Sequence, residues 1–266
     1  MEIIMKKLSD KRLFLLDMDG TIYLDNHLFD GTLDFLHKVK EIGGKYMFVT
    51  NNSSKSADDY VKKLSKIGIE AEIDDFLTST EATIHYINKN YKGKKFYSVG
   101  TESFNKELIN NGINVTCELE DDIYGLVISN DNEINFKKIE DACILLGRDV
   151  KYIATNPDWV CPTSFGYVPD CGCFAEMLKR ATGKEPLFIG KPKPEMILMA
   201  MEKFGYKKEE CVIIGDRVYT DIASGYNAEI DTVLVLSGEA TMKDVEESEI
   251  KPVYIMKNIR EVYENI

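Results

Sequence analysis

Short apolar runs alternate with helix-like segments at both ends of this 266-residue chain. Between residues 11 and 78 the runs read as buried strands, and the segments between them repeat apolar side chains at helical spacing. The same alternation returns from Leu187 to Leu236. This order is typical of βαβ units around a parallel sheet. We therefore predict an α/β chain with a doubly wound parallel sheet built from its two ends.

The middle of the chain carries an alternation of its own, with apolar runs at 96–99 and 152–155 and helix-like segments near them. A stretch this long and this periodic is too regular for a loop. We therefore predict an inserted α/β domain at 80–185, carried by a Rossmann-like core that combines residues 1–79 and 186–266.

The chain is acidic, because 33 Lys and Arg stand against 45 Asp and Glu and give a formal net charge of -12. This charge repels nucleic acids and anionic lipid surfaces at long range, so neither is an expected partner. No apolar stretch reaches the roughly 18 to 20 residues that span a bilayer, and residues 1–10 lack the apolar centre of a secretory signal. The six cysteines include no Cys-x-x-Cys pair for a zinc site, which favours reduced thiols. We expect a cytoplasmic protein.

Two carboxylates follow the first apolar run directly. The run at 13–16 leads into Asp17 and Asp19, and Gly20 closes it. A buried strand would therefore deliver both acids to its carboxyl end, which is where open α/β sheets bind ligands. Two acids one residue apart can divide the work, since one can attack phosphorus while the other moves a proton.

Other polar residues stand where later strands are predicted to end. Thr50 follows the apolar run at 46–49. We predict that a helix starts directly after it, with the backbone N–H groups of Asn51 and Asn52 at its amino end. A hydroxyl and helix-terminal N–H groups suit a phosphate. The remaining strand-end segments are Gly190-Lys191-Pro192, Gly215-Asp216-Arg217 and Thr220-Asp221.

In order, residue type and position, these segments resemble the four motifs of the haloacid dehalogenase-like superfamily of phosphotransferases. The size and place of the insertion resemble the type IIA cap subfamily, which includes NagD-type and p-nitrophenylphosphatase-like enzymes. The resemblance covers essentially the whole chain. It implies that Asp17 is the nucleophile that forms an aspartyl-phosphate, and that Asp19 protonates the leaving alkoxide and then activates water.

This chemistry requires a cation, because a carboxylate is a poor nucleophile toward a dianionic phosphate. Mg²⁺ prefers hard oxygen ligands. We expect the carboxylates of Asp17 and Asp216 and the main-chain carbonyl of Asp19 to bind Mg²⁺, with Asp221 acting through water or by orienting other groups. Lys191 is the matching positive charge for Asp17 and for the phosphoryl oxygens.

The predicted insertion contains a second candidate for substrate contact at 155–159, Thr-Asn-Pro-Asp-Trp. It resembles a sequence of the NagD-like cap that faces the active site. Asn156 and Asp158 are therefore predicted to bind substrate, with Trp159 either stacking on it or packing in an ordinary turn. Residues 169–172, Pro-Asp-Cys-Gly, depart from the Pro-Gly-x-Gly that the family commonly has.

The sequence thus predicts a Mg²⁺-dependent phosphatase that hydrolyses small phosphomonoesters, either nucleoside monophosphates or sugar phosphates. One alternative is a sugar phosphomutase, although such relatives usually carry a smaller helical cap, which is absent between Thr21 and Thr50. Another is a catalytically idle phosphate-binding protein. A homo-oligomer formed through the cap is a further possibility that the resemblance raises.

Overall fold

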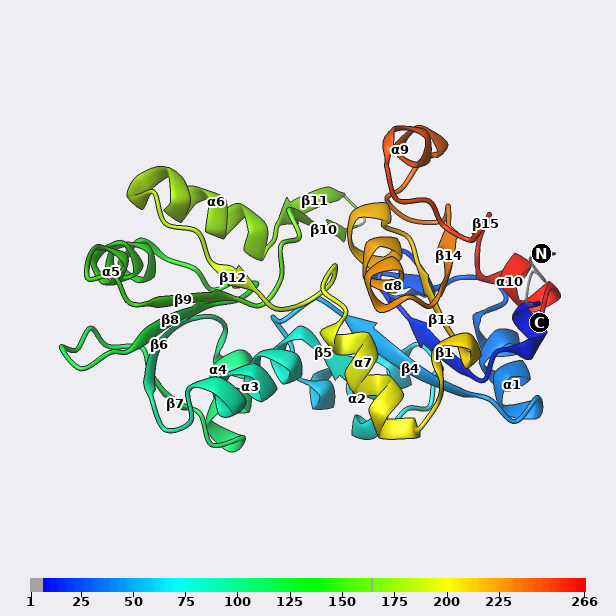
Figure 1. Cartoon of the computed structure of the whole chain (residues 1–266), viewed down its shortest axis with the longest axis horizontal. Helices are drawn as coiled ribbons and strands as arrows, with labels where there is room; N and C mark the ends of the chain where they lie inside the picture. Colours follow the sequence, from blue (N-terminus) through cyan, green and yellow to red (C-terminus); the bar gives the residue numbers. More distant parts are fainter. Residues whose placement is uncertain (1–6, 164) are drawn as a thin grey trace. The chain divides into compact units, whose positions relative to one another are not determined.

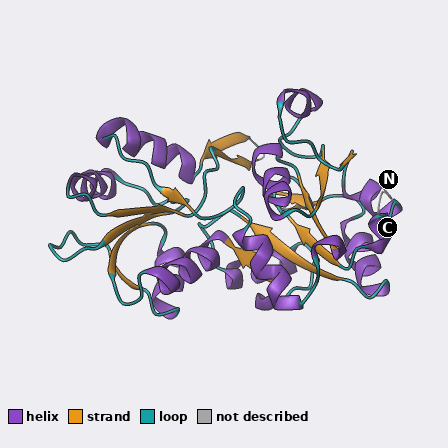
Figure 2. Ribbon diagram, in the orientation of Figure 1, coloured by secondary structure: helices purple, strands orange, loops and turns teal. Residues whose placement is uncertain are grey.

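The computed structural model describes residues 7–163 and 165–266, which form two compact units (Figure 1). The first unit combines the chain up to Val49 with Val61–Leu77 and Pro192–Ile266. The second combines Thr50–Tyr60 with Thr78–Lys191. Each unit has a sheet of its own, flanked by helices (Figure 2).

The sheet of the first unit has six strands in the order β15-β14-β13-β1-β4-β5. The pairs on either side of β1 are parallel, with Leu16 level with Ile214 on β13 and with Phe48 on β4. Every side chain of β1 is buried, as expected for a strand covered on both faces. The strands are β1 (Leu13–Leu16), β4 (Lys45–Thr50), β5 (Phe76–Thr78), β13 (Cys211–Gly215), β14 (Asp231–Val235) and β15 (Tyr254–Met256).

Helices and a small hairpin complete this unit. The apolar stripe of α1 buries Phe35, Leu36 and Val39, and α1 packs against α10. The helices are α1 (Thr32–Glu41), α7 (Glu195–Phe204), a π-helix (Val218–Ile222), α8 (Ala223–Ala228), α9 (Met242–Glu247) and α10 (Ile259–Glu264), with the 3-10 turns Leu8–Asp10, Ile73–Asp75 and Lys208–Glu210. The hairpin consists of β2 (Tyr23–Leu24) and β3 (His27–Leu28), and α2 (Ala57–Lys66) contributes its second half.

The second unit is built on a five-stranded sheet in the order β12-β9-β8-β6-β7, with parallel pairing throughout. Helices α5 and α6 pack together on one face, and α3 and α4 pack together on the other (Figure 1). The strands are β6 (Lys95–Val99), β7 (Asn114–Thr116), β8 (Gly125–Ile128), β9 (Lys151–Ala154) and β12 (Leu187–Phe188), with an antiparallel hairpin of β10 (Val160–Thr163) and β11 (Gly166–Pro169). The helices are α3 (Ser79–Asn90), α4 (Glu102–Asn110), α5 (Phe136–Gly147) and α6 (Cys171–Thr182).

The predicted α/β fold with parallel sheets is confirmed, whereas one strand lies elsewhere than expected. We predicted that the run beginning at Leu187 belongs to the core sheet, but β12 pairs with β9, with Leu187 level with Ile153. An apolar run predicts a strand without specifying the sheet that it joins. The segment Thr50–Tyr60, which runs from the end of β4 into the first turn of α2, also groups with the second unit rather than with the first. The division into a core and an inserted cap at 80 and 185 stays a prediction.

Within residues 7–163 and 165–266, none of the helices combines the length and the apolar character that a membrane span requires.

Candidate active site

Three carboxylates of the first unit form a cluster, the acidic triad of Asp17, Asp216 and Asp221. Each offers an oxygen within 4.8 Å of the others. Asp17 follows β1 and its N–H donates to the carbonyl of Ile214 at 2.9 Å, so the two neighbouring strands bring Asp17 and Asp216 to the same edge. Asp221 comes from the π-helix just beyond, and a π-helix is frequent at functional sites.

Asp216 lies in a recess that two glycines create. The side chain is completely buried, and its Oδ2 accepts a hydrogen bond from the N–H of Glu239 at 2.7 Å. A Cβ on Gly238 would overlap this carboxylate, and a Cβ on Gly20 would lie 2.5 Å from Oδ2. The backbone can approach Asp216 this closely only because both positions lack a side chain.

The other oxygen of this carboxylate, Asp216 Oδ1, is buried without a hydrogen-bond partner among the described residues. Burial, and next the charge of Asp17, raise the pKa of Asp216 well above its usual value, while Arg217 acts in the opposite direction. An unpaired oxygen in a buried carboxylate cluster is costly unless a cation completes it. The triad therefore fits a divalent cation with oxygen ligands, such as Mg²⁺.

Asp221 is held by the backbone of the same loop. Its Oδ2 accepts the N–H of Arg217 at 3.1 Å, and a Cβ on Gly215 would overlap its carboxylate. The Arg217 side chain pairs in turn with Glu239, with Nε 2.8 Å from Oε2. Asp221 is thus an oriented member of the triad.

Asp19 has two contacts that the sequence did not indicate. Its Oδ1 lies 3.3 Å from the Lys63 ammonium, and its Oδ2 accepts the hydroxyl of the buried Tyr23 at 3.4 Å. The ammonium also stands over the Tyr23 ring, 3.9 Å from its centre, a cation–π arrangement. Lys63 lies mid-helix in α2, and nothing in its local sequence distinguishes it from the other lysines of that helix.

The remaining predicted site residues lie in the second unit. Thr50 ends β4, and its Oγ1 accepts the N–H of Asn52 at 3.1 Å, which leaves the hydroxyl hydrogen able to donate. Helix α2 begins at Ala57, so Asn51 and Asn52 precede the helix rather than start it. Ser and Asn residues between these positions bond to one another and delay the first helical turn.

Lys191 follows β12 and is almost fully buried. Its main chain pairs with the side chain of Asn51, whose Oδ1 accepts the Lys191 N–H and whose Nδ2 donates to the Lys191 carbonyl, both at 2.8 Å. Asn156 and Asp158 are also buried and bond within the same group. Trp159, in contrast, is 51% exposed.

The structure thus brings the predicted residues together in two groups. Asp17, Asp19, Asp216 and Asp221 belong to the first unit. Thr50, Asn51, Asn52, Asn156, Asp158 and Lys191 belong to the second. Their catalytic and binding roles stay predictions.

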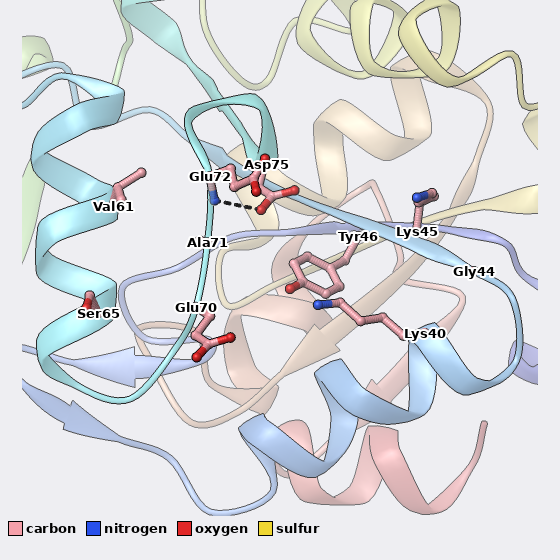
Figure 3. Close-up of a pocket in the computed structure, with 10 residues that line it drawn as sticks. All are labelled: Lys40, Gly44, Lys45, Tyr46, Val61, Ser65, Glu70, Ala71, Glu72 and Asp75. Atoms are coloured by element: carbon pink, nitrogen blue, oxygen red, sulfur yellow. Dashed lines mark hydrogen bonds between the residues drawn. The ribbon is translucent and has the colours of Figure 1, made fainter.

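A separate cavity of about 610 Å³ lies at the amino end of β4, away from the acidic triad (Figure 3). Lys45 and Tyr46 begin that strand, whereas Thr50 ends it. Two of the lining residues bond to each other within one turn, where the Glu72 N–H donates to Asp75 Oδ2 at 2.9 Å. No predicted site residue lines this cavity, so it is not the candidate active site.

Comparisons with known proteins identify the family. A family model described as haloacid dehalogenase-like hydrolase matches residues 14–114, and a second, HAD-hydrolase-like, matches residues 188–262. The acid sugar phosphatase of Staphylococcus aureus strain MRSA252 is 32% identical over 248 residues, which are 93% of this chain and 95% of that protein. The chain belongs to the haloacid dehalogenase-like hydrolase family.

Solved structures place it in the NagD-like branch of the haloacid dehalogenase-like hydrolases. The 4-nitrophenylphosphatase of Thermotoga maritima has a TM-score of 0.90 at 39% identity, covering 97% of this chain and 98% of that one. NagD of Escherichia coli K-12 has 0.84 at 29%, covering 94% and 98%. A glycerol phosphate phosphatase of Mycobacterium tuberculosis, solved in complex with magnesium, has 0.90 at 27%, covering 97% and 78%. The chain is thus a hydrolase whose named relatives are phosphatases.

Proposed function

We propose that this haloacid dehalogenase-like hydrolase is a Mg²⁺-dependent phosphatase that cleaves small phosphomonoesters through an aspartyl-phosphate. The acidic triad carries the proposal, because Asp216 Oδ1 lies buried in the same cluster as Asp17, has no partner among the described residues and suits a divalent cation. The donor set supports the same conclusion, since it contains only oxygens and no histidine or cysteine. The relative crystallised with magnesium is consistent with it.

Asp17 is the proposed nucleophile. One carboxylate oxygen accepts a hydrogen bond from the Thr21 hydroxyl at 3.4 Å, which orients the group. Asp17 attacks phosphorus, and the alcohol leaves with a proton from Asp19. Asp19 then takes a proton from water, which attacks the phosphoryl group, releases inorganic phosphate and restores Asp17. Bound Mg²⁺, held by Asp17, Asp216 and the Asp19 carbonyl, would screen the negative charges that this attack brings together.

The residues that we propose for phosphate binding belong to the second unit. We infer that the Thr50 hydroxyl, the N–H groups of Asn51 and Asn52 and the Lys191 ammonium bind the phosphoryl oxygens. The bonds that join Asn51 to Lys191 support treating these residues as one group.

The inserted region 80–185 is proposed as the cap that selects the substrate. We favour small sugar phosphates over nucleoside monophosphates as the substrates, because the named relatives include an acid sugar phosphatase and a glycerol phosphate phosphatase. Asn156 and Asp158 reach a substrate only if they exchange their present bonds, whereas Trp159 is exposed and needs no such change. The cytoplasmic location and the oligomer through the cap stay predictions.

The direct test is release of inorganic phosphate from p-nitrophenyl phosphate with Mg²⁺. We expect chelation by EDTA to abolish release, and Asp17→Asn to do the same at any Mg²⁺ concentration. Asp121→Asn is the matched control, because it makes the same chemical change at a fully exposed carboxylate. Turnover by Asp17→Asn at the parent rate would refute the mechanism, and an inert parent would favour a phosphate-binding protein.

Asp19→Asn separates the two chemical steps. The carboxamide of this variant cannot supply or accept the proton, so hydrolysis of the aspartyl-phosphate should slow most. Mass spectrometry of the intact protein should then detect one added phosphoryl group during turnover. If the phosphoryl group instead appears on a second sugar phosphate added to the assay, the phosphomutase alternative gains support.

A further inference from the structure

The side chain of Asn51 makes contacts that its proposed role in phosphate binding does not require. Its side chain is buried, and its carboxamide bonds to both main-chain groups of Lys191. Oδ1 accepts the N–H and Nδ2 donates to the carbonyl, each at 2.8 Å. This is the pattern that a neighbouring peptide unit would make in a sheet.

The carboxamide takes over where the strand ladder stops. Beyond β12, the N–H groups of Ile189 and Gly190 still donate to the carbonyls of Ala154 and Thr155, at 3.1 and 2.8 Å. Lys191 comes next, and Pro192 after it has no N–H to extend the pairing. Asn51 therefore binds Lys191, the last residue of this segment that can pair through both its N–H and its carbonyl.

The orientation of the carboxamide is fixed from several sides. Nδ2 also faces Asp158 Oδ1 at 3.3 Å, so a flipped amide would set oxygen against a carboxylate. The main-chain carbonyl of Asn51 is held as well, because it accepts hydrogen bonds from the Ser79 hydroxyl and the Asn156 amide, both at 2.6 Å. A Cβ on Gly190 would overlap Asn51 Oδ1, so the close approach depends on glycine there.

We propose that Asn51 is a positioning residue, whose carboxamide fixes the main chain that carries the Lys191 ammonium. The proposal rests on the proposed function for its consequence, since it matters to catalysis if Lys191 binds phosphate. A lysine side chain has many rotamers, so its ammonium is placed accurately only if its Cα is held. The backbone N–H of Asn51, which is assigned to the phosphate, is a different group from the carboxamide that holds Lys191.

Asn51→Ala tests the pairing without reference to activity. It keeps the backbone N–H and deletes the carboxamide, so the Lys191 N–H loses its acceptor. Hydrogen–deuterium exchange followed on peptides that contain residues 189–193 should speed up at Lys191 by about tenfold or more. Unchanged exchange there would overturn the proposal whether or not the protein is a phosphatase.

A double-mutant cycle tests the consequence. Titration calorimetry with inorganic phosphate and Mg²⁺ should show weaker binding in Asn51→Ala, by about tenfold. In a Lys191→Met background the same substitution should change the affinity by less than about twofold, because the residue that it positions is gone. Equal losses in both backgrounds would mean that Asn51 acts independently of Lys191. If Lys191→Met binds phosphate as the parent does, the proposed function fails while the exchange result still stands.

Two further variants keep the test decisive. Asn130→Ala removes a buried carboxamide of the same unit that bonds to Asp170 and not to Lys191, and it should leave phosphate affinity unchanged. Gly190→Ala displaces the Asn51 carboxamide and leaves its chemistry intact, so it should reproduce both effects of Asn51→Ala if that variant fails to fold. A Gly190→Ala protein with parental exchange at Lys191 and parental phosphate affinity would refute the positioning role.

Discussion

Replacing Asp216 by asparagine should stabilise the metal-free protein while it destroys the cation site. The carboxylate is fully buried, one oxygen has no partner among the described residues, and Asp17 is its neighbour in the triad. In the variant, the amide oxygen at position 216 can still accept the N–H of Glu239, and the new NH₂ group can donate to the carboxylates beside it.

The expected gain follows from what the substitution removes. A buried, unsatisfied acceptor costs about 1–3 kcal/mol, and we take the middle of this range for Asp216 Oδ1. We expect Asp216→Asn to raise the free energy of unfolding by about 2 kcal/mol at pH 7.5, or the melting temperature by roughly 4–8 °C for a chain of this size.

The stability difference between the parent and Asp216→Asn should depend on pH, with a sign set by the pKa of Asp216. The pKa of Asp216 is raised in the folded protein, chiefly by burial, so the native state binds this proton more tightly than the unfolded state does. The parent therefore loses stability through this group as the pH rises above the ordinary value of 3.8. The advantage of Asp216→Asn should be greatest at neutral pH and should shrink as the pH falls toward 4.

Calorimetry with and without Mg²⁺ completes the assay. A cation at 100 times its dissociation constant stabilises the parent by about 2.7 kcal/mol, and Asp216→Asn should lose most of this response. For the stability measured without Mg²⁺, Asp221→Asn is the matched control, because Asp221 is equally buried but its Oδ2 accepts the N–H of Arg217, so this variant should show no comparable gain. A metal-free Asp216→Asn protein that melts below the parent, or that responds fully to Mg²⁺, would refute the reasoning.

Four other substitutions test interactions within each unit by urea unfolding. Tyr152→Phe removes a buried hydroxyl that has no partner among the described residues, so it should be neutral or stabilise the fold by up to about 1 kcal/mol. Tyr97→Phe removes a hydrogen bond to the buried carboxylate of Asp141, 2.9 Å away, so it should cost about 1–2 kcal/mol. Burial and two neighbouring carboxylates raise the pKa of Glu107 to about 7, so Glu107→Gln should stabilise by up to roughly 3 kcal/mol at pH 8 and by nothing below pH 4.5. Lys11→Met leaves the partly buried Asp231 without the ammonium that now lies 2.5 Å from it and should cost about 2 kcal/mol, so an unchanged unfolding midpoint would contradict this account.

The sequence predicted the residues of the acidic triad because each stands close behind a buried strand. A run such as Leu13–Leu16 specifies a strand locally, and parallel pairing then brings the carboxyl ends of β1 and β13 to one edge. Asp17 and Asp216 could therefore be placed together without coordinates.

Contacts with no local signature could not be predicted. The carboxamide of Asn51 finds its partner at Lys191, 140 positions away, and the ammonium of Lys63 finds Asp19 across 44. A polar side chain reveals its partner only once the fold exists, because the same residue on a solvated surface has the same sequence neighbours. The glycine recess around Asp216 was missed for the same reason, since Gly238 looks like an ordinary turn after β14.

The bonds around Asn51 have a practical consequence for protein engineering. A chimaera that exchanges residues 80–185 alone would separate Asn156 from the Asn51 carbonyl that it now contacts. The exchanged segment would carry the Asn156 amide without its acceptor, and the recipient would keep the segment around Asn51 without the donor that it binds. Such hybrid enzymes should therefore be cut so that residues 50–60 and 186–191 are exchanged together with 80–185, because β12 pairs with β9.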